Sequence, residues 1–136
     1  MVKVTQKTRY AIRALLRLKT FGEGGTVLKE ISKEEDIPVK FLEQIFASLA
    51  KADILESKRG AQGGYRLKKS LKEVSLYEVM KSLREDVKFA HCLDIAKPEC
   101  PLKSKCKAEK FWRNIQEKIM KILMETKLEE IDESLS

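Results

Sequence analysis

The chain of 136 residues is predicted to be mainly α-helical: a winged helix-turn-helix with a small β-hairpin wing and a long C-terminal dimerisation helix. Three patterns predict this fold. Two short amphipathic segments flank a tight break at residues 36–38, a basic, glycine-rich hairpin follows directly, and an apolar stripe with helical spacing runs through residues 108–124. Each pattern alone is weak, but their order along one chain is specific.

Residues 5–21 are expected to form the first helix, because apolar side chains recur there at spacings of three and four. Basic side chains fill the other faces. Glycines at positions 22, 24 and 25 end the helix, since glycine tolerates the left-handed backbone of a helix stop. The apolar positions are Tyr10, Ala11, Ala14, Leu15, Leu18 and Phe21.

The next two helices form the predicted helix-turn-helix. A short helix at residues 28–35 is joined to a longer one at residues 38–51 by Asp36, Ile37 and Pro38. Proline suits the first turn of a helix, because its missing N–H has no partner there in any case. The buried side of the longer helix is expected to carry Phe41, Leu42, Ile45, Phe46 and Leu49.

A β-hairpin is predicted directly after this unit. Residues 54–58 begin with the alternation of a half-buried strand, residues 59–64 form a glycine-rich turn, and residues 65–67 return. A helix-turn-helix followed at once by a hairpin with a basic tip is the outline of a winged helix.

Ser75 and Glu78 form a capping box that opens a helix ending near residue 84. No periodicity holds from there to residue 106, and a segment of about 20 residues without structure in a compact domain usually serves a function. The chain is therefore divided into a winged-helix domain (residues 1–84), a cysteine-containing sensor loop (85–107), and a dimerisation helix with an acidic tail (108–136).

The long helix at about residues 108–124 carries Phe111, Ile115, Ile119 and Ile122 in one apolar stripe. One small domain leaves little to cover such a stripe, so pairing with the same helix of a second copy is the first interpretation. Docking on the chain's own first helix is the alternative. Thr126 and Glu129 form a further capping box and predict a short helix in the tail. Trp112 and Tyr65 are most simply core residues.

Charge and composition restrict the functional class. Of the net charge of +7, residues 1–84 carry +8 and residues 85–136 carry −1, as in a nucleic-acid-binding domain with a separate partner region. A solvated lysine-rich surface is the plain alternative. No apolar run reaches the ~18 residues that span a bilayer, and the N-terminus lacks the apolar region of a signal peptide, so a cytoplasmic location with no membrane partner is expected. The single histidine, and the lack of GxGxxG or P-loop motifs, disfavour an enzyme.

Four groups of residues together resemble the Rrf2 family of winged-helix transcriptional regulators, which includes the IscR, NsrR and RirA types. They are Thr8-Arg9-Tyr10-Ala11, Phe41 to Phe46, Arg59-Gly60 with Gly63-Gly64-Tyr65, and Cys-x7-Cys-x5-Cys followed by Phe111-Trp112-Arg113. The resemblance covers nearly the whole chain. It implies a homodimer that binds palindromic promoter DNA, with an iron–sulfur cluster as the sensor. One departure is that Ala61-Gln62 replaces the proline- and glycine-rich wing tip common in relatives, so the fine sequence preference is not carried over.

The expected DNA contacts come from the outer face of the recognition helix and from the wing. Gln44 can pair with adenine through two hydrogen bonds, and Glu43 can accept one from cytosine. Arg59 at the wing tip suits a narrow minor groove, where the negative potential is strongest. The remaining expected contacts, mostly to phosphate, are Lys40, Ser48, Arg9, Lys58 and Arg66. An ordinary solvated polar residue is the alternative for each.

Cys92, Cys100 and Cys106 lie seven and five residues apart, wider than the tight pairs of structural zinc sites and suited to an iron–sulfur cluster. The resemblance implies three cysteines and one non-cysteine ligand. Glu109 is the expected fourth ligand, since it stands where IscR-type relatives carry a histidine, and His91 is its rival. The cluster type, [2Fe–2S] or [4Fe–4S], is open, and protein prepared in air can lack it.

Three hypotheses follow. The first is a DNA-binding repressor that senses iron, redox or nitric oxide status through an iron–sulfur cluster. The second is a regulator of the same fold that uses thiol redox or zinc chemistry. The third is a cysteine-dependent enzyme with His91 as its base, for which the sequence marks neither a pocket nor an oxyanion site.

Overall fold

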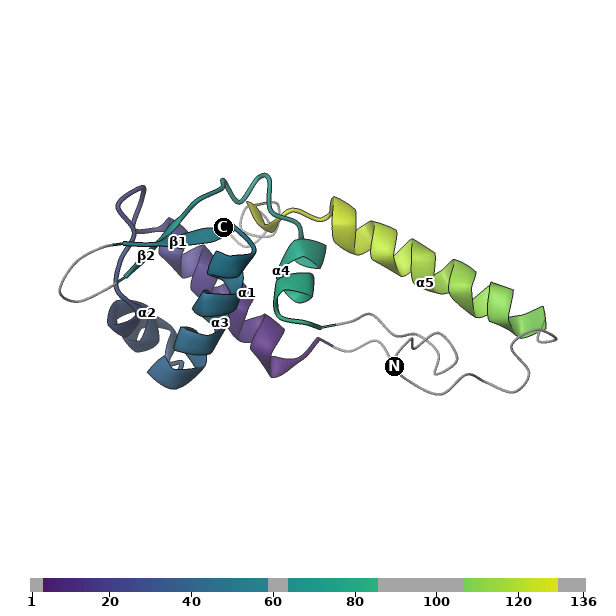
Figure 1. Cartoon of the computed structure of the whole chain (residues 1–136), viewed down its shortest axis with the longest axis horizontal. Helices are drawn as coiled ribbons and strands as arrows, with labels where there is room; N and C mark the ends of the chain where they lie inside the picture. Colours follow the sequence, from purple (N-terminus) through teal and green to yellow (C-terminus); the bar gives the residue numbers. More distant parts are fainter. Residues whose placement is uncertain (1–3, 59–63, 86–106, 130–136) are drawn as a thin grey trace.

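The computed structural model describes residues 4–58, 64–85 and 107–129, which form five α-helices and one two-stranded antiparallel sheet (Figure 1). The mainly α winged helix-turn-helix predicted from the sequence is confirmed. The elements in chain order are α1 (Gln6–Lys19), α2 (Leu28–Glu35), α3 (Val39–Lys51), β1 (Leu55–Ser57), β2 (Tyr65–Leu67), α4 (Leu76–Ser82) and α5 (Lys107–Glu125).

The first helix begins where Thr5 caps it: the Thr5 hydroxyl oxygen accepts a hydrogen bond from the Thr8 backbone N–H at 3.2 Å. It ends at Lys19, two residues before the predicted end, and Phe21 beyond it is 38% exposed. One face of α1 is fully buried, and it carries Ala11, Ala14, Leu15 and Leu18. Helices α2, α3 and α4 all pack against α1.

The core joins α1 to the helix-turn-helix and the hairpin. From α3, the side chains of Leu42, Ile45, Phe46 and Leu49 are all buried, as the sequence predicts. The Phe46 ring meets the Tyr65 ring of β2 edge-on at 5.3 Å, so Tyr65 is half-buried against this core. The turn between α2 and α3 buries Ile37, and the helix-turn-helix is thereby fixed to the hairpin through one continuous apolar cluster.

The hairpin pairs Leu55 with Leu67 and Ser57 with Tyr65. Tyr65 also exchanges two backbone hydrogen bonds with Thr26, at 3.0 and 2.9 Å, which ties the loop before α2 to β2. Gly25 is required for this approach, because its φ is +68° and a Cβ there would lie 2.1 Å from the Tyr65 carbonyl oxygen.

The chain after α5 returns to the start of α4. The Leu76 N–H donates to the Thr126 carbonyl at 2.9 Å, and the Leu128 N–H donates to the Val74 carbonyl at 3.0 Å. The Ser75 hydroxyl oxygen accepts from the Glu78 N–H at 3.1 Å, so the predicted cap of α4 is confirmed. Leu128 itself is fully buried in the core, which holds this return in place.

The short helix predicted in the tail is borne out as far as the described chain reaches, because a helical turn begins at Leu128. The predicted cap differs: the Thr126 hydroxyl donates back to the Ile122 carbonyl at 2.8 Å, at the end of α5, and the Glu129 N–H donates to the Leu71 carbonyl. Glu129 lies 3.4 Å from Lys19 Nζ and ties this end of the chain to α1.

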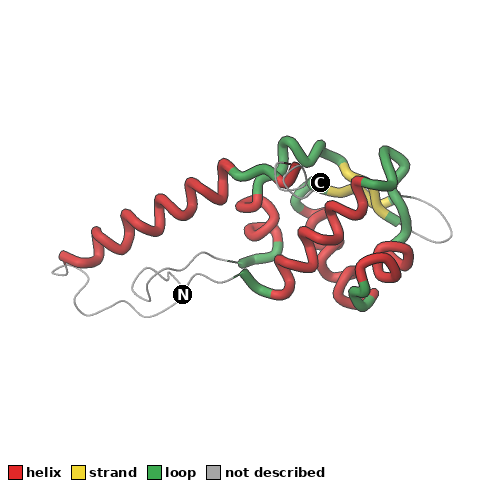
Figure 2. The backbone as a smooth tube through the Cα atoms, turned by 180° about the vertical axis from the view of Figure 1, so that it is seen from behind, coloured by secondary structure: helices red, strands yellow, loops and turns green. Residues whose placement is uncertain are grey.

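Helix α5 projects from the domain. Figures 1 and 2 both show it meeting α4 at its C-terminal end and extending away from α1, so the alternative of docking on the first helix is excluded. Within the described chain none of its residues is buried, and Phe111 and Ile122 are 59% and 62% exposed. Trp112, expected in the core, is 36% exposed, because nothing in the described chain covers this helix beyond its attached end. None of the described helices is long and apolar enough to cross a membrane.

Leu128→Ala tests whether the segment after α5, which bonds the start of α4, stabilises the domain. Removing a fully buried leucine side chain is expected to lower the free energy of unfolding by about 2–5 kcal/mol, measured by urea denaturation. Met124→Ala on the last turn of α5, where the side chain is 44% exposed, serves as the control and should change it by no more than about 0.5 kcal/mol. Equal effects of the two variants would contradict the assigned anchor.

Candidate nucleic-acid interface and cysteine segment

The outer face of α3 presents the polar side chains expected to read DNA. Lys40, Glu43 and Gln44 are exposed on the first turns of the helix, whereas Ser48 is half-buried at its edge. Successive residues of a helix turn by about 100°. Lys40, Glu43 and Gln44 therefore spread over about 100° of the outer face, and Ser48 lies about 40° beyond Gln44, at the edge that borders α1 and α4.

Phe41 does not belong to the buried side of α3, contrary to the sequence prediction. Its side chain is 49% exposed, and its ring lies edge-on to Tyr10 of α1 with 6.0 Å between ring centroids. The position is a quarter-turn from Lys40, between the buried and the polar face. Phe41 therefore forms an aromatic border to the polar face of α3.

A hollow of about 1140 Å³ separates α3 from the wing. It is lined by the start of α2, by Val39 and Glu43 of α3, and by Ser57, Lys58, Gly64 and Tyr65 of the hairpin. Lys29 and Lys33 of α2 line it as well, and sequence reasoning missed both. Their spacing of four residues, which places them on one face of a short helix, was the available signal.

The wing and the N-terminal helix contribute exposed cations. Lys58 and Arg9 are exposed, and Arg66 on β2 forms an ion pair with Glu56 of β1. An exposed pair of this kind is weak in water and can exchange its partner for a phosphate. Arg59, the predicted minor-groove contact, lies outside the described residues.

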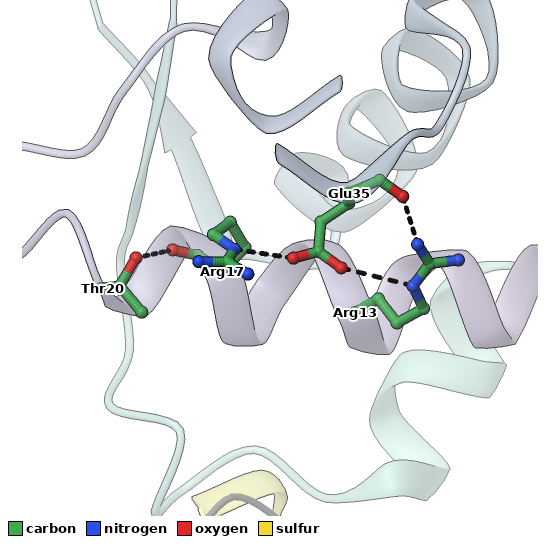
Figure 3. A network of polar contacts seen from close by, with 4 residues as sticks. All are labelled: Arg13, Arg17, Thr20 and Glu35. Atoms are coloured by element: carbon green, nitrogen blue, oxygen red, sulfur yellow. Dashed lines mark hydrogen bonds and ion pairs between the residues drawn. The ribbon is translucent and has the colours of Figure 1, made fainter. Parts of the chain in front are cut away.

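An ion-pair network holds the first helix of the helix-turn-helix against α1 (Figure 3). Glu35, in the last turn of α2, accepts hydrogen bonds from Arg17 Nε at 2.6 Å and from Arg13 Nε at 3.3 Å. Arg13 also donates to the Glu35 backbone carbonyl, so both the side chain and the backbone of Glu35 are held. The hydrogen bond and the charge of Glu35 raise the pKa of Arg17, so the guanidinium stays charged throughout the physiological range.

This network was not predicted from the sequence. Arg13 and Arg17 are four residues apart on one face of α1, but their partner stands 18 residues further along the chain, across a loop. By fixing Glu35, the two arginines fix the turn that sets the direction of α3.

The expected metal ligands are only partly within the described chain. Cys92, Cys100, Cys106 and the rival ligand His91 lie outside it. Glu109 lies in the first turn of α5, where its Oε1 accepts hydrogen bonds from Arg113, one of them from Nε at 2.9 Å. Among the residues that the structure does describe, no three His, Cys, Asp or Glu side chains come close enough together to hold a metal ion.

The comparison with protein families gives a match over residues 4–133. The matching model is that of Rrf2, described as an iron-dependent transcriptional regulator. The chain belongs to the Rrf2 family. The expected resemblance is thus confirmed, and with it the expectation that the chain is a transcriptional regulator and not an enzyme.

Regulators named IscR and CymR are among the similar proteins. The regulator IscR of Klebsiella pneumoniae is 33% identical over 131 residues, which cover 96% of this chain and 79% of IscR. The structure of T. potens IscR matches with a TM-score of 0.73 at 26% identity, over 99% of this chain and 89% of that one. CymR, described as the global cysteine regulator of B. subtilis, matches with a TM-score of 0.71 at 27% identity, over 96% of both chains.

Proposed function

We propose that this Rrf2-family chain is a homodimeric repressor whose binding to promoter DNA is controlled by an iron–sulfur cluster that senses iron, redox or nitric oxide status. The observation that carries the proposal is the position of α4. This helix packs beneath the DNA-reading helix α3, and both ends of the cysteine-containing unit, residues 85–107 with α5, are attached to it.

The polar face of α3 supports direct reading of bases. Lys40, Glu43 and Gln44 stand together on its first turns, which is the part of a recognition helix that enters the major groove. Gln44 reads adenine, Glu43 accepts from cytosine, and Lys40 meets a phosphate. The hollow beside the hairpin sets the wing apart from α3, so Arg59 reaches the neighbouring minor groove while Lys58, Arg66 and Arg9 neutralise phosphates.

The uncovered stripe on α5 supports the dimer. Phe111 and Ile122 lie eleven residues apart on one face, with Ile115 and Ile119 between them. An apolar stripe of this length on an isolated helix is stabilised when the same helix of a second copy packs against it. A two-fold axis at α5 would set the two α3 helices against successive turns of the duplex.

The donor set supports an iron–sulfur cluster. Three thiolates on one segment are the soft ligands that such clusters use, and a carboxylate completes the set less firmly. Glu109 would have to share its carboxylate with Arg113, which already binds Oε1. When bound, the cluster would supply iron that is lost or oxidised when the iron, redox or nitric oxide status of the cell changes.

The attachments of the segment support a mechanical transmission. At its start, the Glu85 carboxylate accepts a hydrogen bond from the Thr5 hydroxyl, which caps α1. At its end, the backbone bonds of residues 126–128 hold the start of α4. A rearrangement of residues 85–107 therefore pulls on α1 and α4 together and changes the spacing of the two winged helices.

The second candidate is a regulator that uses thiol redox or zinc chemistry at the same cysteines. It is favoured by the similarity to CymR, a regulator connected with cysteine, at an identity close to that of the IscR structure. A disulfide or zinc site is colourless, whereas an iron–sulfur cluster absorbs visible light.

The first prediction concerns DNA. The protein is expected to bind a two-fold symmetric promoter duplex with half-sites about one helical turn apart. If each subunit neutralises about four phosphates, log K should fall against log salt with a slope of about −7. Fluorescence anisotropy over a salt series measures this, and salt-independent binding or no binding to any promoter fragment would contradict the repressor function.

Two variants separate base reading from phosphate binding. Gln44→Ala should relax discrimination at one base pair of each half-site by about 1–3 kcal/mol. Arg59→Ala should instead weaken binding to most sequences and reduce any preference for A·T-rich flanks. Loss of affinity without loss of discrimination in Gln44→Ala would show that this residue does not read a base.

The dimer is tested by charges within the stripe. Ile115→Glu combined with Ile119→Glu should give monomers in sedimentation velocity, because four carboxylates would meet at the interface. Met124→Glu, on the opposite side of the helix from Ile115, is the control and should remain dimeric. Circular dichroism checks that the winged helix stays folded, and a dimeric double variant would place the interface elsewhere.

The ligand set is tested by single replacements. Each of Cys92→Ser, Cys100→Ser and Cys106→Ser should abolish visible absorption, because a lost thiolate leaves the set incomplete. Glu109→Ala should leave a less stable, bleachable chromophore, and His91→Ala should change little. If His91→Ala lost the absorption and Glu109→Ala kept it, His91 and not Glu109 would be the fourth ligand.

A further inference from the structure

A second hollow, of about 730 Å³, opens on the side of α3 that faces away from the wing. It lies between the start of α1, the C-terminal half of α3 and α4. Its lining residues are Lys7, Ser48, Lys51, Ala52, Lys69, Glu78, Lys81, Ser82 and Arg84. The side chains thus come from α1, α3 and α4, which are well separated in the sequence, and from Lys69 in the segment before α4.

The charge of this lining is strongly unbalanced. Five of the nine residues are cations and one is a carboxylate, Glu78, which lies 3.6 Å from Lys69. The other four cations, Lys7, Lys51, Lys81 and Arg84, are in no ion pair within the described part of the chain. Elsewhere on the domain cations such as Arg13 and Arg17 have acidic partners. Four like charges around one hollow repel each other, and an anion bound there would relieve that repulsion.

Lys51 places the hollow at the edge of the expected major groove. It follows Lys40 by eleven residues on α3, which is just over three full turns, so both side chains point in nearly the same direction. The two positions are about 16 Å apart along the helix axis. Since the major groove is about 12 Å wide, a helix that reads bases at its first turns reaches a phosphate strand near Lys51.

We propose that this hollow binds backbone phosphates of the duplex on the side of α3 opposite to the wing. The inference rests on the proposed DNA binding and adds a contact surface to it. Lys7, Lys51, Lys81 and Arg84 supply the charge, and the Ser48 hydroxyl lines the same hollow as a donor. The half-buried position of Ser48 thereby receives a role at the phosphates and not at a base edge.

The test compares two double variants of equal charge in the full-length protein. Lys51→Gln with Lys81→Gln removes two exposed cations of the hollow, and Lys72→Gln with Lys121→Gln removes two exposed lysines elsewhere. Affinity is measured over a salt series on an operator duplex and on an unrelated duplex. Circular dichroism and sedimentation verify that both variants remain folded and keep the oligomeric state of the wild type.

Each lost phosphate contact reduces the salt slope by about 0.9, so four contacts per dimer should reduce its magnitude by about 3 to 4. The hollow variant should show this reduction on both duplexes, and the control variant should change the slope by less than about 1. A hollow variant that keeps the wild-type slope would overturn the inference while leaving the DNA-binding function intact, and would point to an acidic protein surface as the occupant. A wild-type protein that binds neither duplex would defeat the proposed function and this inference together.

Discussion

The buried side chain of Leu128, with the backbone hydrogen bonds on either side of it, determines where the long helix points. These contacts hold the end of α5 against the start of α4, and α5 leaves the domain from that point (Figure 1). Because the helix is attached at one end, its apolar stripe has nothing from the described chain to cover it. The proposed dimer and the spacing of its two winged helices both depend on this attachment.

In the proposed function, helix α4 connects the cysteine-containing unit, residues 85–107 with α5, to the DNA-reading surface. It packs against α1 and α3, and it borders the basic hollow through Lys81 and Arg84. The chain enters the cysteine segment directly after Arg84, and Glu85 is bound to the residue that caps α1. Under the proposal, a change in the cysteine segment alters the phosphate contacts on one side of α3 and leaves the base-reading face unchanged. The ion pairs of Glu35 with Arg13 and Arg17 hold the turn before α3 against α1, and so they help to keep the orientation of α3 fixed.

Much of this fold could be predicted from the sequence, because local signals and the global fold agree. Helical periodicity and the cap at Ser75 located the helices to within about two residues, and the order of helix-turn-helix and hairpin gave the architecture. The errors share one cause, which is that the sequence does not say what covers a given face. Phe41 has the character of a core residue but lies a quarter-turn away from the core. Trp112 was assigned to a core that α5 does not reach.

The sequence could predict which residues of the candidate site are exposed, but not which residues from other elements they lie against. The exposed positions of Lys40, Glu43 and Gln44 follow from the helical period alone. The Arg13–Arg17–Glu35 network and the hollow with Lys7, Lys51 and Lys81 join elements that are distant in sequence, so only the packing of the domain brings them together. The tail helix does begin at Leu128 as predicted, but the Thr126 hydroxyl bonds the end of α5, because a threonine between two helices can serve either one.

The central claim is that the cysteine segment carries an iron–sulfur cluster, and the most direct test is the visible absorption spectrum of wild-type protein purified without oxygen, with iron and sulfide counted per chain. The account predicts a brown protein with iron and acid-labile sulfide present in similar amounts and one cluster in each subunit. A colourless protein that stays free of iron after anaerobic reconstitution would contradict it and leave thiol or zinc chemistry as the basis of regulation.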